Sequence, residues 1–504
     1  MGTTITSFVL QGIEATPCVI EADVSHTTLP RTTVVGLPDM AVRESSERVR
    51  TAITNSGFEY PFGRVTINLA PADLRKEGPV YDLPIALAIL SAGGVISEEG
   101  RHRLDRCMVA GELALDGSLR SVRGVVSLAL LARSTGRRHL IVPRANGDEA
   151  AMVDGVDVWP ANCLGDVVGH LNGMDRLEPV DGNRLRSRVH VGHGSGPDLS
   201  EIKGQVVAKR ALAIAAAGWH NLLMVGPPGC GKTMLAMALP GLLPPLTWEA
   251  MLELTQVYSC AGRQGMSDGL VTVRPVRAPH HTASGPAIVG GGSVPRPGEV
   301  SLAHHGVLFL DELPEFSKAT LEALRQPMQD RVVTIARVSA TLQFPAGFLL
   351  VAAANPSGGA RNRGAWDRGY IDRLSGPLVD RIDLHVSLEP VPVRVLRSRS
   401  SSAEASSHCI RQQVRNAIDR RRARQGMVPN AELTGTMLDA LVPLTDAAEQ
   451  FLVETVDELG LSARGWDTLR RVARTIADLD DIDQVELGHV TEAVGFRLLD
   501  RVTG

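Results

Sequence analysis

Residues 226–233 read GPPGCGKT and lie between the apolar run NLLMV (221–225) and the helical run TMLAMAL (233–239). Strand, glycine-rich loop and helix in this order match the phosphate-loop pattern G-x-x-x-x-G-K-[ST]. The glycines let backbone N–H groups close around phosphate oxygens, and the N-terminal end of the helix dipole adds to the attraction. The stretch therefore predicts a nucleoside triphosphate site in an α/β domain with a parallel sheet.

The loop residues have distinct expected roles. Lys232 should reach the β- and γ-phosphates, and the hydroxyl of Thr233 should ligate Mg²⁺. Cys230 should turn its side chain away while its N–H faces phosphate. We predict that ATP contacts the whole loop, namely Gly226, Pro227, Pro228, Gly229, Cys230, Gly231, Lys232 and Thr233.

Two further apolar strands end in polar residues suited to hydrolysis. GVLFLDEL (306–313) ends in Asp311 and Glu312, and GFLLVAAANP (347–356) ends in Asn355. Asp311 is expected to hold Mg²⁺ directly or through water, and Glu312 to polarise the attacking water. Asn355 is expected to lie between phosphate and water. The alternatives are an ordinary acidic turn and an Asn-Pro turn.

Composition limits the class of protein. The chain has 504 residues, which at ~150 residues per domain predicts about three domains. A net charge of -4 gives no overall nucleic-acid signature, so any DNA-binding surface must be local. No apolar run approaches the ~18 residues of a spanning helix. The N-terminal MGTTITSFVLQG lacks a basic leader, so we expect a cytoplasmic protein without a signal peptide.

The six cysteines occur singly, and none forms a CxxC pair or a zinc-like spacing with histidine. We therefore expect reduced thiols and no structural zinc.

Pattern divides the chain into four parts. Residues 1–172 alternate strand-like and helical runs and should form a mixed α/β domain. Residues 173–198 are expected to be a linker, because they contain the polar, Gly-rich and basic stretch NRLRSRVHVGHGSGPD. Residues 199–390 form the nucleotide-binding core, and 391–504 carry helical patterns. The expected strands of the first part are TITSFVL, CVIEADV, RTTVVGL, RVTINLA, CMVAGELAL and HLIVP.

The three strand ends resemble the Walker A, Walker B and sensor elements of AAA+ ATPases. The resemblance implies a site between the subunits of a ring, to which a neighbour supplies an arginine. RLSGPLVDRIDLHV (373–386) resembles the segment that carries this arginine finger. Arg381 is the first candidate and Arg373 the second, and a local ion pair with Asp380 or Asp383 is the alternative role.

The C-terminal part resembles the helical lid of these ATPases. LSARGWDTLRRVARTIADL (461–479) is similar to the sensor-2 helix, in which Arg464 is expected to contact the γ-phosphate. The other arginines of this stretch are expected to form a solvated helix face. They are Arg470, Arg471 and Arg474.

Longer segments resemble the ComM/YifB family of magnesium-chelatase-like AAA+ proteins. They are DLSEIKGQVVAKRALAIAAAGWHNLLMVGPPGCGKTMLA, RAPHHTASGPAIVGGG, PRPGEVSLAHHGVLFLDELPEF and RLSGPLVDRIDLHV. The resemblance implies an ATP- and Mg²⁺-dependent homo-hexameric ring that acts on DNA by branch migration or helicase activity. The sequence departs from the family after Asn355, where NPSGGARNRGAWDRGYIDR (355–373) replaces a cysteine-rich stretch. This basic, aromatic insert either contacts nucleic acid or is an ordinary surface loop.

The N-terminal part resembles the proteolytic domain of Lon. KEGPVYDLPIALAIL (76–90) is similar to the nucleophile segment, and GELALDGSLRSVRGVVSLALLA (111–132) to the segment with the catalytic lysine. In this alignment the two catalytic positions are Val80 and Val126. A Ser–Lys dyad needs a nucleophile and a base, and valine supplies neither, so we expect a non-proteolytic domain.

The remaining candidate functional residues lie in two histidine pairs and one loop. His280 with His281 and His304 with His305 are expected to be poor chelates, because adjacent histidines on one strand point to opposite faces. Coupling to a pore or to a neighbour is therefore favoured over zinc. The Gly-rich loop AIVGGGSVPRPGE (287–299) is a candidate pore loop. Two alternatives to a DNA motor are an ATPase subunit for metal insertion and a regulatory assembly ATPase without DNA.

Overall fold

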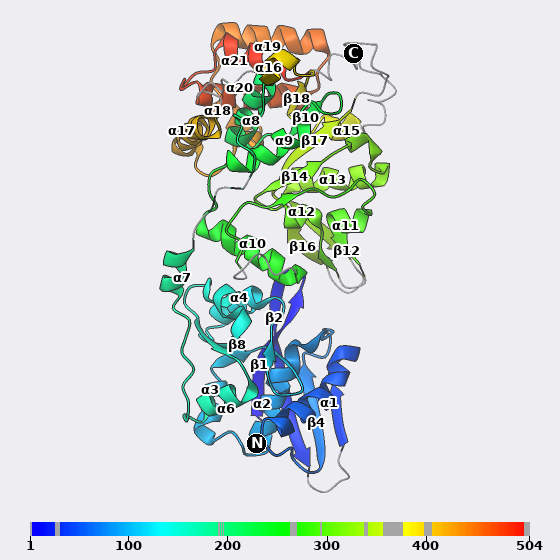
Figure 1. The fold of residues 1–504 in the computed structure, drawn as a ribbon, viewed down its shortest axis with the longest axis vertical. Helices are drawn as coiled ribbons and strands as arrows, with labels where there is room; N and C mark the ends of the chain where they lie inside the picture. Colours follow the sequence, from blue (N-terminus) through cyan, green and yellow to red (C-terminus); the bar gives the residue numbers. More distant parts are fainter. Residues whose placement is uncertain are drawn as a thin grey trace. The chain divides into compact units, whose positions relative to one another are not determined.

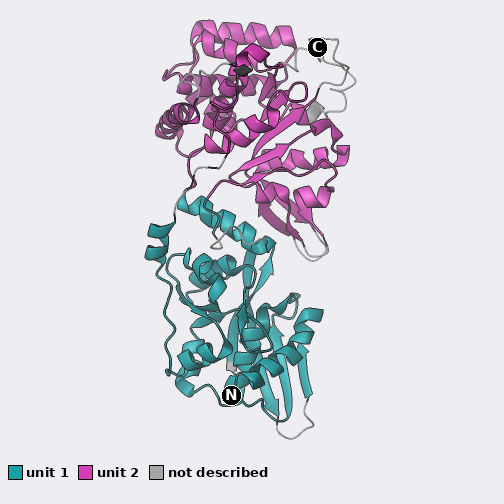
Figure 2. Cartoon of the chain, in the orientation of Figure 1, with its two compact units in different colours: residues 1–190, 247–272 teal, residues 191–246, 273–504 magenta. Residues whose placement is uncertain are grey.

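The chain forms two compact units (Figures 1 and 2). Unit 1 comprises Met1–His190 and Thr247–Thr272, and unit 2 comprises Val191–Leu246 and Val273–Gly504. The chain thus crosses between the units after residues 190, 246 and 272. The computed structural model describes residues 3–25, 31–189, 192, 194, 196–262, 270–292, 295–336, 341–355, 376–397 and 406–497.

Unit 1 is built on a seven-stranded mixed sheet with the order β3-β4-β2-β1-β5-β8-β9. β1 and β2 form an antiparallel ladder, and β2 pairs antiparallel with β4. The β3–β4, β1–β5, β5–β8 and β8–β9 pairs are parallel. The strands are β1 Thr3–Gln11, β2 Glu14–Ser25, β3 Arg31–Val35, β4 Arg64–Ala70, β5 Cys107–Val109, β8 His139–Pro143 and β9 Asp157–Ala161, with a hairpin of β6 Glu112–Leu113 and β7 Leu119–Arg120.

Helix α2, Asp82–Ala92, fills the centre of unit 1. Its residues from Asp82 to Ser91 are all buried, as expected of a helix that is apolar around its circumference. The only charged residue, Asp82, is held by Arg48 Nε at 2.7 Å and Ser45 Oγ at 2.5 Å. The other helices are α1 Met40–Asn55, α3 Glu98–Leu104, α4 Val125–Ser134, α5 Gly147–Ala151, α6 Leu164–Leu171 and α7 Gly182–Arg188.

Unit 1 also contains α10, Trp248–Ala261, which comes from within the sequence assigned to the nucleotide-binding core. α10 packs against α4, and the N–H of Gly124 donates to Ser259 Oγ at 3.0 Å. Leu252 joins the apolar cluster around Val126. The four-part division proposed from the sequence stays a prediction, but the segment 247–272 folds with the N-terminal part.

Unit 2 is built on a five-stranded parallel sheet with the order β11-β14-β17-β10-β18. β10, β14 and β17 are buried throughout, which explains why they appear in the sequence as continuous apolar runs. Because the strands are parallel, their carboxyl ends meet at one edge of the sheet. The strands are β10 Leu222–Val225, β11 Val276–Arg277, β14 Val307–Leu310, β17 Leu349–Ala354 and β18 Leu384–Ser387.

Helices and two hairpins surround this sheet (Figure 1). The candidate pore loop is a hairpin of β12 Gly290–Gly291 and β13 Arg296–Pro297, preceded by α11 Gly285–Val289. A second hairpin joins β15 Val332–Ala336 to β16 Thr341–Pro345. The remaining helices of this region are α8 Val206–Gly218, α9 Lys232–Ala238, α12 Glu299–Leu302, α13 Lys318–Asp330, α15 Gly376–Val379 and α16 Val393–Arg397.

The C-terminal helices share one hydrophobic core with the parallel sheet. Ile476 of α20, Val414 of α17 and Val351 of β17 belong to the same buried cluster. The helical patterns predicted within 391–504 are confirmed and include α17 Ser407–Gln425, α18 Thr436–Leu441, α19 Asp446–Leu459, α20 Ala463–Leu479 and α21 Leu487–Gly495. The predicted fold class, two α/β parts and a helical C-terminal region, is likewise confirmed.

Two sequence expectations differ from the structure. The stretch expected to be a linker contains a helix, α7, whose Asp181 cap accepts from the N–H groups of Asn183 and Arg184. The arginines of α20 do not form a solvated face. Arg474 is fully buried, and its guanidinium pairs with Asp478 at 3.1 Å and donates to the Ile482 carbonyl at 2.6 Å. Among the residues described, no helix is long and apolar enough to cross a membrane.

Candidate active site

The phosphate loop starts at the carboxyl end of β10 and leads into α9. Gly229 and Gly231 have φ angles of 79° and 98°, which only glycine adopts without strain. The N–H of Gly226 donates to the Ala354 carbonyl at 3.2 Å, which ties the loop to the end of β17. A Cβ at Gly226 would lie 2.6 Å from the Leu388 carbonyl, so this position admits only glycine.

Lys232 is buried within the loop. Its Nζ donates to the carbonyls of Gly226 and Pro227 at 2.7 and 3.0 Å and to Asn355 Oδ1 at 2.8 Å. The structure therefore brings the predicted phosphate lysine and the predicted sensor asparagine into direct contact. These oxygens are partners of the ammonium group that a bound triphosphate would replace.

Thr233 and Asp311 face one another across the ends of β10 and β14. The Thr233 hydroxyl lies 3.4 Å from Asp311 Oδ2, and both side chains are exposed. A hydroxyl and a carboxylate are the hard oxygen ligands that Mg²⁺ prefers, and it retains water on its other positions. The two residues therefore fit the predicted magnesium site.

Glu312 follows Asp311 with a left-handed backbone, φ 52°. Its N–H donates to Asp311 Oδ1 at 2.9 Å. Glu312 Oε2 lies 3.3 Å from Nδ1 of His281, a contact that the sequence did not predict. The structure thus places the candidate base at the strand ends together with Asp311.

Gln205 is a further residue that the sequence analysis missed. Its Nε2 donates to the Cys230 carbonyl at 3.1 Å and to the Glu389 carbonyl at 2.8 Å. Gln205 therefore clamps the phosphate loop to the chain that follows β18. Gln205 has a left-handed backbone, φ 55°, just before α8 begins.

The structure places Arg381 at the amino ends of the parallel strands, whereas the phosphate loop lies at their carboxyl ends. Asn221, which immediately precedes β10, donates from Nδ2 to the Arg381 carbonyl at 3.3 Å. The four residues of β10 then run away from this point, about 13 Å of extended chain, before the phosphate loop begins. Arg381 is therefore separated from the loop of its own chain by the length of a strand.

Arg464 lies beside Arg381 at this edge. Both guanidinium groups donate to Gln329 Oε1, Arg381 at 3.2 Å and Arg464 at 3.5 Å. Burial lowers the pKa of Arg381, and the positive charges of Arg464 and Arg325 lower it further. Asp380 lies 3.7 Å from Arg464 Nη1. The second finger candidate, Arg373, and the insert at 356–373 lie outside the residues described.

The Lon-like positions form part of an apolar core. Val126 is fully buried, and Val80 packs against the same cluster. The two side chains that the alignment equates with a catalytic dyad thus make hydrophobic contacts.

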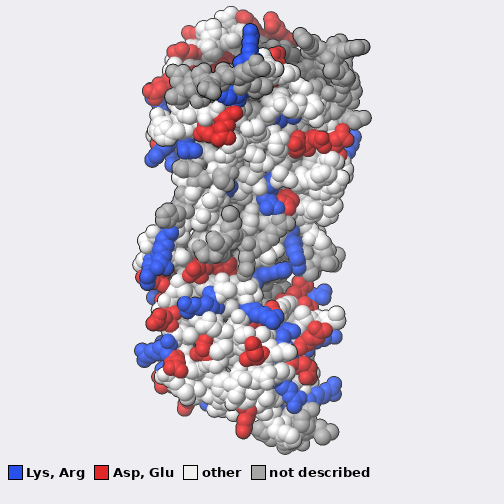
Figure 3. Space-filling model, viewed as in Figure 1, with Lys and Arg blue, Asp and Glu red and all other residues white. Residues whose placement is uncertain are grey.

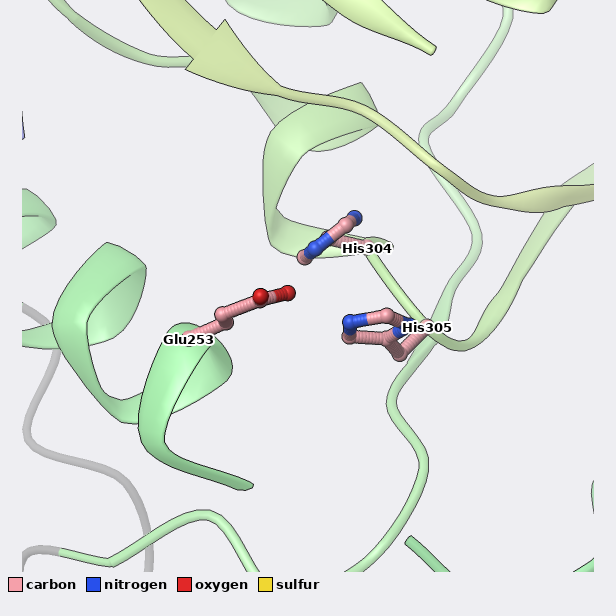
Figure 4. A group of neighbouring side chains, drawn as sticks. All are labelled: Glu253, His304 and His305. Atoms are coloured by element: carbon pink, nitrogen blue, oxygen red, sulfur yellow. The ribbon is translucent and has the colours of Figure 1, made fainter. Parts of the chain in front are cut away.

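The second histidine pair has a structural role (Figure 4). His304 Nδ1 accepts from the Gly347 N–H at 2.9 Å, and the His305 N–H donates to the Gly347 carbonyl at 2.9 Å. The pair lies in a turn and its two rings pack with centroids 3.9 Å apart, so the expectation that adjacent histidines point to opposite faces of a strand is wrong. This pair therefore anchors the turn before β14. Glu253, also labelled in Figure 4, belongs to α10 of unit 1.

A phosphate loop, an Asp-Glu pair and an asparagine at adjacent parallel strand ends, with arginines at the opposite edge, define a P-loop ATPase of the AAA+ class. The comparisons with known proteins agree with this class. The family described as magnesium chelatase, subunit ChlI, matches residues 198–396. Two further families of this subunit also match. The family described as subunit ChlI of Mg-chelatase matches residues 20–146, and the family of the subunit's C-terminal part matches residues 404–497.

Relatives that align over nearly their full length show to which family of magnesium-chelatase-like proteins the chain belongs. The chain is 43% identical over 498 residues to the YifB protein of Escherichia coli K12 and to competence protein ComM of Haemophilus influenzae, and each alignment covers 97% of this chain and 96% of the relative. It is also 30% identical over 143 residues to Lon protease 2 of Bacillus subtilis, which covers 27% of this chain and 26% of that protein. The chain belongs to the ComM/YifB family of magnesium-chelatase-like AAA+ proteins.

Proposed function

We propose that this protein hydrolyses ATP at sites shared between neighbouring copies in a homo-hexameric ring. One copy supplies the loop 226–233, Mg²⁺ held by Thr233 and Asp311, and Glu312 as the base that polarises water. The next copy supplies Arg381 and Arg464. The single observation that carries this proposal is the position of the arginines at the sheet edge opposite their own loop.

Each residue of the site has a separate role in ATP hydrolysis. Thr233 and Asp311 would hold Mg²⁺, which would supply positive charge to offset that of the triphosphate. Lys232 exchanges its carbonyl partners for phosphate oxygens and leaves Asn355 available to orient water. The arginines stabilise the charge that develops during transfer, a contribution that reaches about 10³–10⁵ in kcat in related nucleotide hydrolases. A head-to-tail interface of this kind closes into a ring when its rotation permits.

We further propose that the ring moves DNA in the cytoplasm, by branch migration or helicase activity. The full-length similarity to a competence protein supports this role, as does the β12–β13 hairpin as a substrate-gripping element. Acidic and basic side chains are interspersed on the visible face of each unit (Figure 3). DNA contacts are therefore expected on local elements.

One cluster of basic residues, at 420–424, makes ion pairs and buried contacts within unit 2. In the run RRRAR (420–424), Arg420 pairs with Asp481, Arg424 forms a bidentate pair with Asp478, and Arg421 is buried. This cluster is consequently a weaker candidate for DNA contact than α7 or the insert at 356–373.

The proposal is tested by measuring ATP turnover with and without single-stranded, duplex and forked DNA. We expect turnover that Glu312→Gln abolishes, stimulation by DNA, and DNA binding that weakens steeply with salt because phosphate contacts dominate. ATPase activity without stimulation or remodelling of branched DNA would contradict the DNA role. That result would favour a regulatory ATPase or a subunit that assists metal insertion.

A further inference from the structure

A buried polar cluster lies at the amino ends of β10 and β18, outside the candidate active site. His220, two residues before β10, is fully buried, and its Nδ1 lies 3.4 Å from Oδ2 of Asp383, the residue before β18. On the other side of the ring, Nε2 shares a hydrogen bond of 2.8 Å with Oγ1 of Thr475, a fully buried residue of α20. A Cβ at Gly218 would lie 2.2 Å from Nε2, so the glycine leaves the space that the ring needs. His220 therefore joins the start of β18 to a C-terminal helix inside unit 2.

This cluster also holds the chain segment that carries Arg381. The N–H of Asn221 donates to Asp383 Oδ2 at 3.1 Å, and Asn221 Nδ2 donates to the Arg381 carbonyl at 3.3 Å. Asn221 Oδ1 accepts from the Leu350 N–H at 2.9 Å, which ties the same side chain to β17. The segment from Arg381 to Asp383 is thus fixed at two points against the central strands of the sheet.

The contact on the other side of the His220 ring reaches the helix that carries Arg464. Arg464 lies in the first turn of α20, eleven residues before Thr475. At ~1.5 Å per residue, about 16 Å of continuous helix joins the two positions. Thr475 Oγ1 also accepts from Asn430 Nδ2 at 3.0 Å, which holds this turn of α20 from a second direction. From the interior of unit 2, His220 therefore contacts the elements that carry both candidate arginines.

The buried cluster constrains the two arginines more tightly than their shared surface contact does. A buried hydrogen-bond network favours one arrangement of the elements that it joins, because a displacement leaves polar groups without partners in a medium of low polarity. At the surface, the guanidinium groups of Arg381 and Arg464 share the exposed Gln329 at 3.2 and 3.5 Å. An exposed amide at these distances is a weak restraint, so the buried cluster sets the spacing between the arginines.

We propose that His220 is a positioning residue that fixes the spacing between Arg381 and Arg464, so that both guanidinium groups reach the triphosphate on the neighbouring copy. Its imidazole contributes no atom to the reaction and acts through Asp383 and Thr475, which lie on opposite sides of one rigid ring. The inference rests on the proposed function, in which the two arginines complete the site of another copy. A misplacement of about 1 Å in such a group can cost about 10²-fold in rate.

Subunit mixing separates this role from a purely structural one. His220→Ala alone should lower kcat about tenfold or more, while its affinity for a fluorescent non-hydrolysable ATP analogue stays at the wild-type value because its phosphate loop is intact. In an equal mixture with Lys232→Ala it should regain up to about a quarter of wild-type turnover, since the Lys232 variant supplies an intact arginine pair. In a mixture with Arg381→Ala it should regain none, because neither copy then has such a pair.

Thr475 offers a second variant with a matched control. Thr475→Val removes the hydroxyl with little change of volume and should give the same pattern of rescue. Thr475→Ser keeps the hydroxyl and should retain most of the wild-type turnover. This pair decides the inference if His220→Ala does not assemble. His408→Ala, a change at an exposed histidine of α17, controls for the loss of a histidine elsewhere and should leave turnover unchanged.

Two results would overturn this inference. One is rescue of His220→Ala by Arg381→Ala, or no rescue by Lys232→Ala, since either outcome places the defect in the phosphate loop of the same copy. The other is wild-type kcat in assembled His220→Ala and Thr475→Val proteins. A reference mixture of Lys232→Ala and Arg381→Ala that exchanges subunits and yet stays inactive would instead refute the shared site itself.

Discussion

At the scale of single residues, the sequence predicted the parts of the site that lie next to one another along the chain. The phosphate loop and the Asp-Glu pair follow apolar strands, and both patterns are local. Gln205, Gln329 and His281 were not predicted as partners, because each acts through a residue that is distant in the sequence. Such contacts depend on how strands and helices assemble, which a local pattern does not contain.

Substitutions of Lys232 and of Glu312 should affect different steps of the ATPase reaction. Lys232→Ala should abolish ATP binding, because the ammonium group that replaces carbonyl partners with phosphate is gone. Glu312→Gln should bind ATP but fail to hydrolyse it, since an amide cannot polarise water as a base does. Fluorescent-nucleotide titration together with phosphate release measures both. Turnover in Glu312→Gln equal to that of the wild type would contradict the assigned base.

Cys230 is expected to be chemically dispensable. Its side chain is only 4% exposed, and Sγ lies 3.8 Å from Lys232 Nζ. Cys230→Ser should therefore retain ATPase activity, because serine is smaller and can also accept from the lysine. Alkylation of Cys230 should block ATP by bulk, and bound ATP should slow the reaction. A serine variant without activity, although folded, would assign the thiol a direct role.

At the scale of elements, strongly patterned strands and helices were predicted well. The run RVTINLA coincides with β4, and the five C-terminal helices lie where the helical patterns indicated. The assignment of α10 to a unit could not be predicted, because its amphipathic face is compatible with any apolar partner. Its partner is α4, and the contact becomes visible only in three dimensions.

The α4–α5–α10 region predicts a dependence of stability on pH. Burial raises the pKa of Glu149 to about 7, although a hydrogen bond from Asn146 Nδ2 at 2.6 Å opposes the shift. The folded state therefore binds this proton more tightly than the unfolded state, so stability is lost as pH rises from about 4.5 to 7. Glu149→Gln removes this dependence, with a gain on the order of 3 kcal/mol above pH 7.

Hydrogen–deuterium exchange of α5 peptides, corrected for intrinsic exchange rates, measures this effect. The variant should be more protected than the wild type at pH 8 and similar to it at pH 5. Asp148→Asn, a change at the adjacent acidic residue, is the matched control. Equal protection of wild type and Glu149→Gln at both pH values would show that Glu149 does not titrate in this range.

At the scale of the whole molecule, the proposed ATPase site uses both ends of the strands in the parallel sheet of unit 2. The phosphate loop, Asp311 and Asn355 occupy the edge with the strand carboxyl ends. Arg381 and Arg464 share Gln329 at the other edge. We therefore propose that a single chain carries two complementary halves of an active site and that each half is completed by a second copy of the chain.

A mixing experiment tests this claim most directly. Lys232→Ala and Arg381→Ala proteins should each lack turnover when assayed alone. Random assembly of equal amounts pairs an intact loop with an intact arginine edge at about a quarter of the interfaces. The account predicts that the mixture regains up to this share of wild-type ATPase activity. A mixture that exchanges subunits, as shown by co-purification of differently tagged copies, and yet stays inactive would contradict it.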